Sequence, residues 1–175
     1  MKYFLLTSDE KNRLPRTRNL YEQIDVRQLN KQHAHKLERF TSVEVEPHID
    51  TLYPDVLSKP LFMVSKGVAE VMSYYDSSVD FKIAALFDLE NGVGTTYFIP
   101  IFDRVDCLTE GTEFSKDRGE IFHAVIDPGK TMGKAFFRLD GVKNTYVAAR
   151  LDFVESLLRR KAIGLAIEEI SIGSR

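Results

Sequence analysis

Residues 61–89, LFMVSKGVAEVMSYYDSSVDFKIAALFDL, contain the pattern that decides the fold class. The apolar run at 61–64 predicts a short strand, and Ser65 follows it as a favourable helix N-cap. Four apolar residues then recur at helical spacing and predict a helix over about 65–75: Val68, Val71, Met72 and Tyr75. The β-prone run at 81–89 comes next. This stretch therefore predicts a strand, a helix and a second strand.

The chain continues with a hairpin pattern. Residues 95–105 form another β-prone run, and Asn91-Gly92 lies in the connection, where it is a strong signal for a β-hairpin. Nearer the N-terminus, residues 2–7 and the alternating residues 41–48 predict two more strands. The residues between these two strands are polar and irregular, and they predict only a short helix within 20–39.

The C-terminal part of the chain shows the strand–helix–strand pattern a second time. Residues 145–148 and 165–172 predict strands, the latter at a sheet edge, and residues 150–161 predict the helix between them. The predicted inner face of this helix comprises Leu151, Val154, Leu157, Leu158 and Lys161. A shift of 83 residues matches Val68, Val71 and Tyr75 with Leu151, Val154 and Leu158. The match is one of pattern rather than identity, so an internal duplication and a chance echo explain it equally well.

These elements predict an α+β fold in which an antiparallel sheet carries two principal helices. Strands at 121–126 and 135–139 add to the sheet, and residues 106–120 predict a loop. The 175 residues include 12 Phe and 7 Tyr and are 43% hydrophobic, which suffices for a hydrophobic core without disulfides or a structural metal. We therefore expect residues 1–175 to form a single domain, in which the patterns determine residues 1–50 least.

Cysteine content and hydropathy bear on the compartment. Cys107 is the single cysteine, so no internal disulfide can form. The apolar run at 3–6 is too short for a signal-peptide core, and no apolar run reaches the roughly 20 residues of a membrane helix. We therefore expect a cytoplasmic protein without a membrane partner.

The formal net charge of −2 conceals a division along the chain. Residues 1–40 contain nine Lys/Arg and five Asp/Glu, residues 41–128 contain six and sixteen, and residues 129–175 contain nine and five. A general nucleic-acid binder neutralises phosphates with a basic face, so the acidic middle argues against a nucleic-acid partner. It fits either an ordinary solvated surface or a docking face for a basic protein.

Histidine and cysteine residues lack the spacing of catalytic or metal-binding motifs. His33 and His35 are two residues apart in a polar segment with no third ligand nearby, whereas a helical metal pair would be three or four apart. Cys107 has Asp103 and Asp106 close by in sequence, and carboxylates raise the pKa of a thiol. This favours a packing role over a nucleophilic one.

Glycine and carboxylate patterns point the same way. Gly129-Lys130-Thr131 resembles the end of a phosphate-binding loop, but the glycine five residues earlier is missing and a strand follows instead of a helix. Glu168 and Glu169 are adjacent on a predicted strand, so their side chains point to opposite faces. We therefore predict no catalytic, cofactor-binding or metal-binding residues and no cofactor, although residues far apart in sequence can still assemble a site.

One stretch has the composition of a partner-binding surface. Its acidic residues are Asp103, Asp106, Glu110, Glu113, Asp117 and Glu120. The apolar residues interleaved with them are Phe102, Leu108, Phe114 and Phe122. Exposed aromatic side chains often anchor protein–protein contacts, and carboxylates would attract a basic partner. A solvated loop beside strands has the same composition, so both interpretations stay open.

Five mostly apolar segments carry a family resemblance. They are residues 59–65 (KPLFMVS), 105–108 (VDCL), 135–139 (AFFRL), 146–151 (YVAARL) and 162–170 (AIGLAIEEI). Together they resemble a family of immunity proteins from bacterial polymorphic-toxin systems that was long catalogued as a domain of unknown function. The resemblance covers about residues 57–172, and its motifs include no catalytic residue.

The resemblance implies a cytoplasmic protein, encoded beside a toxin, that binds the toxin stoichiometrically and blocks it. The toxins of such systems are diverse, so the activity of the target does not follow. Two other classes stay open: a small hydrolase-like enzyme with a site dispersed in sequence, and a structural or regulatory binding module that self-associates. We expect a binding protein rather than an enzyme, and the sequence leaves its oligomeric state open.

Overall fold

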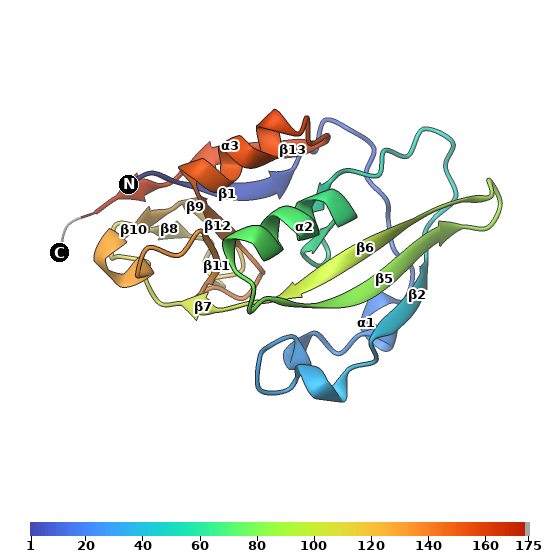
Figure 1. The fold of residues 1–175 in the computed structure, drawn as a ribbon, viewed down its shortest axis with the longest axis horizontal. Coiled ribbons are helices and arrows are strands. Elements are labelled where there is room, and N and C mark those ends of the chain that lie inside the picture. Colours follow the sequence, from blue (N-terminus) through green and yellow to red (C-terminus); the bar gives the residue numbers. More distant parts are fainter. Residues whose placement is uncertain (174–175) are drawn as a thin grey trace.

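Two five-stranded sheets form the framework of the computed structural model, which describes residues 1–173 (Figure 1). The first sheet has the order β13 (Leu165–Glu169), β1 (Tyr3–Ser8), β12 (Val147–Arg150), β11 (Phe136–Leu139) and β7 (Arg104–Val105). The second has the order β2 (Phe40–Glu44), β5 (Asp80–Asp88), β6 (Val93–Ile101), β4 (Met63–Val64) and β3 (Val56–Leu57). The α+β class is confirmed, but two mostly antiparallel sheets replace the single predicted one. The division follows from the chain leaving β6 at residues 102–103 and entering the other sheet at β7.

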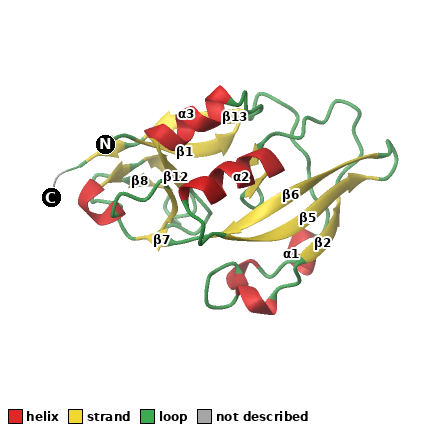
Figure 2. Cartoon of the chain, viewed as in Figure 1, coloured by secondary structure: helices red, strands yellow, loops and turns green. Residues whose placement is uncertain are grey.

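Helices and short strand pairs complete the fold. The helices are α1 (Leu20–Gln23), α2 (Lys66–Tyr75) and α3 (Leu151–Arg159), and 3-10 turns span Val26–Gln28, Ala34–Lys36 and Pro128–Thr131. Two further pairs join β8 (Glu113–Phe114) to β9 (Ile121–His123) and β10 (Val125–Ile126) to β14 (Ser171–Ile172). Figure 2 shows that loops dominate between β1 and β2, as the polar sequence there predicts. Among residues 1–173 no helix is long and apolar enough to cross a membrane.

Each sheet contains a split β-α-β unit. In the second sheet β4 and β5 are parallel, α2 connects them, and the antiparallel strand β6 lies between them. In the first sheet β12 and β13 are parallel, α3 connects them, and the antiparallel strand β1 lies between them. The predicted second strand–helix–strand unit is therefore present, and its topology is the same as that of the first.

The predicted inner face of α3 is partly wrong. Leu151 and Leu158 are 38% and 51% exposed, and Lys161 lies beyond the end of the helix. The physical reason is Phe153, whose ring packs against the rings of Tyr75 and Phe136 at centroid distances of 5.3 and 5.0 Å. The buried face consists of Phe153, Val154 and Leu157. It aligns with Val68, Ala69 and Met72 of α2 after a shift of 85 residues instead of 83.

The two helices pack against each other in a core that both sheets share (Figure 1). This shared core takes Val71 and Met72 from α2, Val154 from α3, and Phe136 and Val147 from the first sheet. Each sheet covers a separate cluster of buried residues on its other face. Because one core contains residues from both sheets, side-chain packing fixes how the two sheets sit relative to each other.

Local signals position the second sheet, and long-range pairing positions the first. The Ser65 hydroxyl accepts a hydrogen bond from the Val68 N–H at 3.4 Å, as predicted for an N-cap. Gly92 has a φ of 63° in the predicted β5–β6 turn, a conformation that residues with a Cβ rarely adopt. By contrast, β1 comes from the first ten residues and lies between β12 and β13. The N-terminal part of the chain thus supplies a central strand.

Candidate functional site

The six acidic residues of the predicted binding surface do not form one cluster. Asp103 lies in the link between β6 and β7, where it forms ion pairs with Lys134 at 2.5 Å and Lys31 at 2.7 Å. Hydrogen bonds from these two lysines lower the pKa of Asp103 from its ordinary value. The adjacent Phe102 packs against the Phe136 ring in the shared core instead of facing solvent. Asp103 and Phe102 therefore hold the link between the sheets in place.

The other five acidic residues lie on residues 106–126, which we name the acidic lobe. Within it β8 pairs with β9, and its last strand, β10, pairs with β14 outside the lobe. Four of its carboxylates are exposed and make no ion pair within the described part of the chain: Asp106, Glu110, Glu113 and Glu120. Asp117 differs, because it forms an ion pair with Lys143 at 3.7 Å. Hydrogen bonds from the Ser115 hydroxyl at 2.7 Å and the Gly119 N–H at 3.0 Å lower its pKa.

Aromatic side chains lie among these carboxylates. Phe122, on β9, is 63% exposed. Phe114 is half-buried, and the Arg118 guanidinium lies 4.0 Å from its ring centroid. Asp106 and Glu110 line one hollow together with Phe114 and Arg118. The acidic lobe therefore presents unpaired carboxylates around partly exposed aromatic surface, a composition that suits contact with a basic protein.

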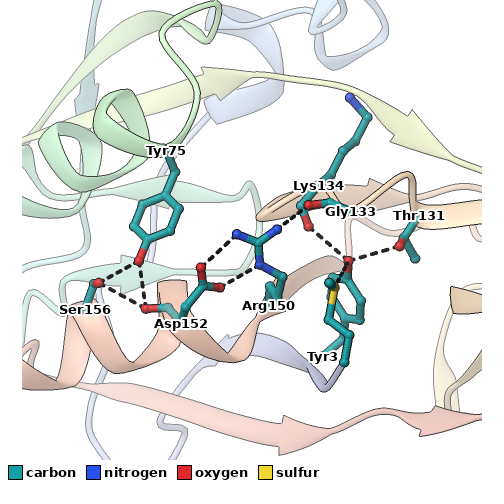
Figure 3. A network of polar contacts seen from close by, with 9 residues as sticks. Tyr3, Tyr75, Thr131, Gly133, Lys134, Arg150, Asp152 and Ser156 are labelled. Carbon is teal, nitrogen blue, oxygen red and sulfur yellow. Dashed lines mark hydrogen bonds and ion pairs between the residues drawn. The ribbon is translucent and has the colours of Figure 1, made fainter.

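A polar network near the shared core joins α2, α3 and β12 (Figure 3). Arg150 donates to both carboxylate oxygens of Asp152 at 2.7 Å and to the carbonyl oxygen of Gly133. The Tyr75 hydroxyl donates to the backbone carbonyl of Asp152 at 2.9 Å and lies 2.8 Å from the Ser156 hydroxyl. Because these side chains bind one another, we interpret the network as a fastening between the helices and the first sheet.

Other residues singled out in the sequence are also held by internal contacts. Burial raises the pKa of Cys107 to about 12, and the charge of Asp106 acts in the same direction. The thiol thus stays protonated at neutral pH and packs as predicted. The Gly129 N–H donates to the Asp127 carboxylate at 2.9 Å, within the 3-10 turn. Over residues 1–173 no group of three His, Cys, Asp or Glu is arranged to hold a metal ion.

A cleft of about 570 Å³ lies between the first sheet and the loop that connects β3 to β4. Its charged lining residues are all cationic, and we name it the cationic cleft: Arg27, Lys59, Arg104, Arg138 and Lys143. They come from a 3-10 turn, the β3–β4 loop, β7, β11 and the β11–β12 turn. No sequence motif predicts this site, because its residues lie in five separate segments and because the middle of the chain is acidic. The one faint signal is Arg138, a lone charge within an apolar run.

Arg138 is the cleft residue without a counterion. Among the described residues its side chain makes no ion pair and no hydrogen bond, whereas the parallel register of β7 and β11 places it opposite Arg104. Burial and, to a lesser degree, the charge of Arg104 lower the pKa of Arg138 to about 10, while the charge of Asp140 acts in the opposite direction. The guanidinium is still charged at neutral pH, so a positive charge without a protein partner borders the cleft.

Comparison with known proteins adds no relative. No protein-family model matches the sequence, and no curated protein matches it. The resemblance to immunity proteins therefore stands on the five sequence segments alone.

Proposed function

We propose that the protein is a binding protein that neutralises a cognate toxin of a bacterial polymorphic-toxin system by covering it stoichiometrically in the cytoplasm. The observation that carries this proposal is the acidic lobe. Its four exposed carboxylates make no ion pair in the described part of the chain, and Phe122 of the same lobe is exposed. A surface of this kind gains most from a partner that supplies the missing positive charges.

Electrostatics gives the lobe a kinetic role. Exposed like charges on one lobe attract an oppositely charged partner over roughly a Debye length, about 10 Å at 0.1 M salt. Such steering raises association rates by about ten- to a thousandfold, and salt suppresses the gain. Once docked, exposed aromatic side chains such as Phe122 supply the apolar contact that slows dissociation. The lobe is therefore expected to govern the association rate, and its aromatic surface the dissociation rate.

Complex formation is the first test. The protein and the toxin domain encoded beside its gene are co-expressed and then passed over a sizing column. We expect host cells to survive and the two chains to elute together at a fixed ratio. Cell death without a complex contradicts the proposed function.

Charge reversal on the acidic lobe is the second test. We expect the fourfold variant Asp106→Lys, Glu110→Lys, Glu113→Lys and Glu120→Lys to lower the association rate at low salt at least tenfold. The matched control carries the same change in net charge at exposed carboxylates elsewhere: Glu22→Lys, Glu38→Lys, Glu46→Lys and Glu90→Lys. Stopped-flow mixing at two salt concentrations measures both variants.

The control variant separates the effect of the lobe surface on the association rate from the effect of the net charge of the protein. If the lobe is the docking face, the control variant keeps most of the wild-type rate and the lobe variant loses it. Equal losses in both variants mean that net charge alone steers the partner. An unchanged rate for the lobe variant means that the toxin docks on another face.

A further inference from the structure

The cationic cleft gathers five cations, and carboxylates of the protein compensate their charge only in part. Four of its five cations have a carboxylate nearby, and none of these carboxylates lines the cleft. The pairs are Arg27–Asp25 at 2.9 Å, Lys59–Glu10 at 3.1 Å, Lys143–Asp117 at 3.7 Å and Arg104–Asp140 at 3.8 Å. Such exposed pairs contribute little and leave the cations free to contact another anion. The fifth cation, Arg138, has no carboxylate partner among residues 1–173.

The strand geometry explains why Arg138 faces the cleft. On β11, Phe137 and Leu139 are buried in the core behind the first sheet, so the alternate residues Phe136 and Arg138 point to the other side. Arg104 lies opposite Arg138 on β7, and like charges directly opposite each other on neighbouring strands are unfavourable. No buried side-chain nitrogen among the described residues lacks a hydrogen-bond partner. The unpartnered nitrogens of Arg138 are therefore open to the cleft.

We propose that the cationic cleft binds a small organic phosphate of nucleotide size, with its phosphate oxygens held by Arg138 and Arg104. A guanidinium presents a planar fork of N–H donors that matches phosphate oxygens, and two neighbouring forks match a group with two negative charges. The anion also relieves the repulsion between the two arginines. This inference is independent of the proposed toxin binding.

The remainder of the cleft fits the organic part of such a ligand. A volume of about 570 Å³ is typical of small-molecule sites, which are mostly apolar with a few polar groups. Uncharged side chains make up the other walls, among them Tyr21, Leu29, Pro60 and Tyr146. The Tyr21 hydroxyl donates to the Pro60 carbonyl at 3.3 Å and so ties α1 to the opposite wall. These tyrosine rings suit a planar group next to the phosphate.

The rim of the cleft disfavours a long polyanion. Glu10, Asp25 and Asp117 pair with the rim cations and Asp140 pairs with Arg104, so these carboxylates would repel the flanking charges of a nucleic acid strand or an acidic peptide. A compact ligand places its charge at Arg138 and Arg104, where Asp140 is the one carboxylate of the four that pairs with a phosphate-binding arginine. The observations therefore favour a small phosphate over a phosphate-bearing polymer.

Isothermal titration calorimetry tests the proposal with ADP, inorganic pyrophosphate and citrate as probes, without toxin and without divalent cations. We expect ADP to bind with a stoichiometry of one and more tightly than pyrophosphate, and citrate to bind most weakly. Arg138→Gln should weaken ADP binding at least tenfold. The control Arg39→Gln removes an exposed arginine outside the cleft and should bind ADP as the wild type does.

Thermal unfolding shows whether the Arg138→Gln variant is folded and whether ADP stabilises it. Arg138→Gln removes one of two repelling charges, so we expect its Tm without ligand to equal or exceed that of the wild type, and ADP to raise the Tm of the wild type only. If Arg138→Gln does not fold, Lys59→Gln and Lys143→Gln at the rim should each weaken ADP binding severalfold. Undetectable binding of ADP and pyrophosphate at millimolar concentration, unchanged binding by the variants, or tighter binding of citrate overturns the proposal. None of these results bears on the toxin complex.

Discussion

The two split β-α-β units have the same topology but are closed in different ways. In the second sheet the inserted strand β6 follows β5 through a tight turn. In the first sheet the inserted strand is β1, which comes from the opposite end of the chain from β12 and β13. The entropy cost of loop closure grows with the length of chain enclosed. Assembling the unit of the first sheet therefore costs more entropy than assembling the unit of the second sheet. The same arrangement thus rests on local pairing in one sheet and on long-range pairing in the other.

The helices differ in what they bury against each other. At equivalent positions α2 presents Val68 and Ala69, whereas α3 presents Phe153 and Val154. The large ring on α3 belongs to the unit that lacks a local hairpin. We infer that the stability of the first sheet depends more on packing in the shared core. The stability of the second sheet depends more on its β5–β6 turn and on the N-cap of α2.

Truncating the equivalent helix residues should give the largest contrast between the units. Phe153→Ala removes a ring that is 1% exposed and packs against Tyr75 and Phe136, and we expect a loss of about 3–5 kcal/mol in the free energy of unfolding. Val68→Ala removes only two methyl groups, and we expect a loss of about 1–2 kcal/mol. Urea unfolding followed by circular dichroism measures both.

Phe153→Leu covers the case in which the alanine variant does not fold. It keeps most of the apolar volume but loses both ring contacts, so we expect a loss of about 1–2 kcal/mol. Similar losses for Phe153→Ala and Val68→Ala would contradict this difference and mean that the two helices contribute alike to the shared core.

The split unit of the second sheet could be predicted because its signals are local, whereas the edge strand β3 was not predicted. Asn91-Gly92 stands between two β-prone runs, and Ser65 directly precedes the helical spacing that it caps. The sequence predicts helix α3 equally well, but it does not predict which face of the helix is buried. Leu158 fits a helical period as well as Phe153 does, and only the rings of Tyr75 and Phe136, far away in sequence, favour Phe153.

The candidate sites were harder to predict because charge compensation is a property of the fold. Asp103 appears in the sequence as one more carboxylate of an acidic run, yet Lys31 and Lys134 from distant segments neutralise it. Arg138 gave one faint signal, since it is a lone charge within the apolar run AFFRL. Its meaning depends on Arg104, whose position opposite Arg138 follows from pairing between β7 and β11.

Removing one of the contacts that join the two units should have an intermediate effect. The Asp55 carboxylate accepts hydrogen bonds from the Ser65 hydroxyl at 2.5 Å, at the start of α2, and from the Ile163 N–H at 2.7 Å, after α3. We expect Asp55→Ala to cost about 2–3 kcal/mol, since hydrogen bonds to charged groups are the stronger kind. Urea unfolding of the variant measures the loss.

A double-mutant cycle shows whether Asp55 acts through Ser65. Ser65→Ala alone removes an N-cap and should cost about 1 kcal/mol. Because the two side chains share a hydrogen bond, the double variant should lose less than the sum of the single losses. Additive losses would show that Asp55 stabilises the chain only through Ile163 and does not link the units through the α2 cap.

The smallest expected effect concerns the N-terminal ends of α2 and α3, which should differ in how their contribution to stability depends on pH. No acidic residue lies in the first turn of α2, whereas Asp152 in the first turn of α3 binds Arg150, whose hydrogen bonds lower the pKa of Asp152. A folded-state pKa below the unfolded value stabilises the fold above about pH 4, and this stabilisation is lost as the pH falls through the lower value. Because the carboxylate is 48% exposed, we expect Asp152→Asn to cost only about 0.5 kcal/mol at pH 7 and less at pH 2.5. Urea unfolding at both pH values measures the difference, with Glu155→Gln on the same helix as the control for removal of one charge. A loss that is the same at both pH values would assign the role of Asp152 to packing, and the two helix starts would then no longer differ in kind.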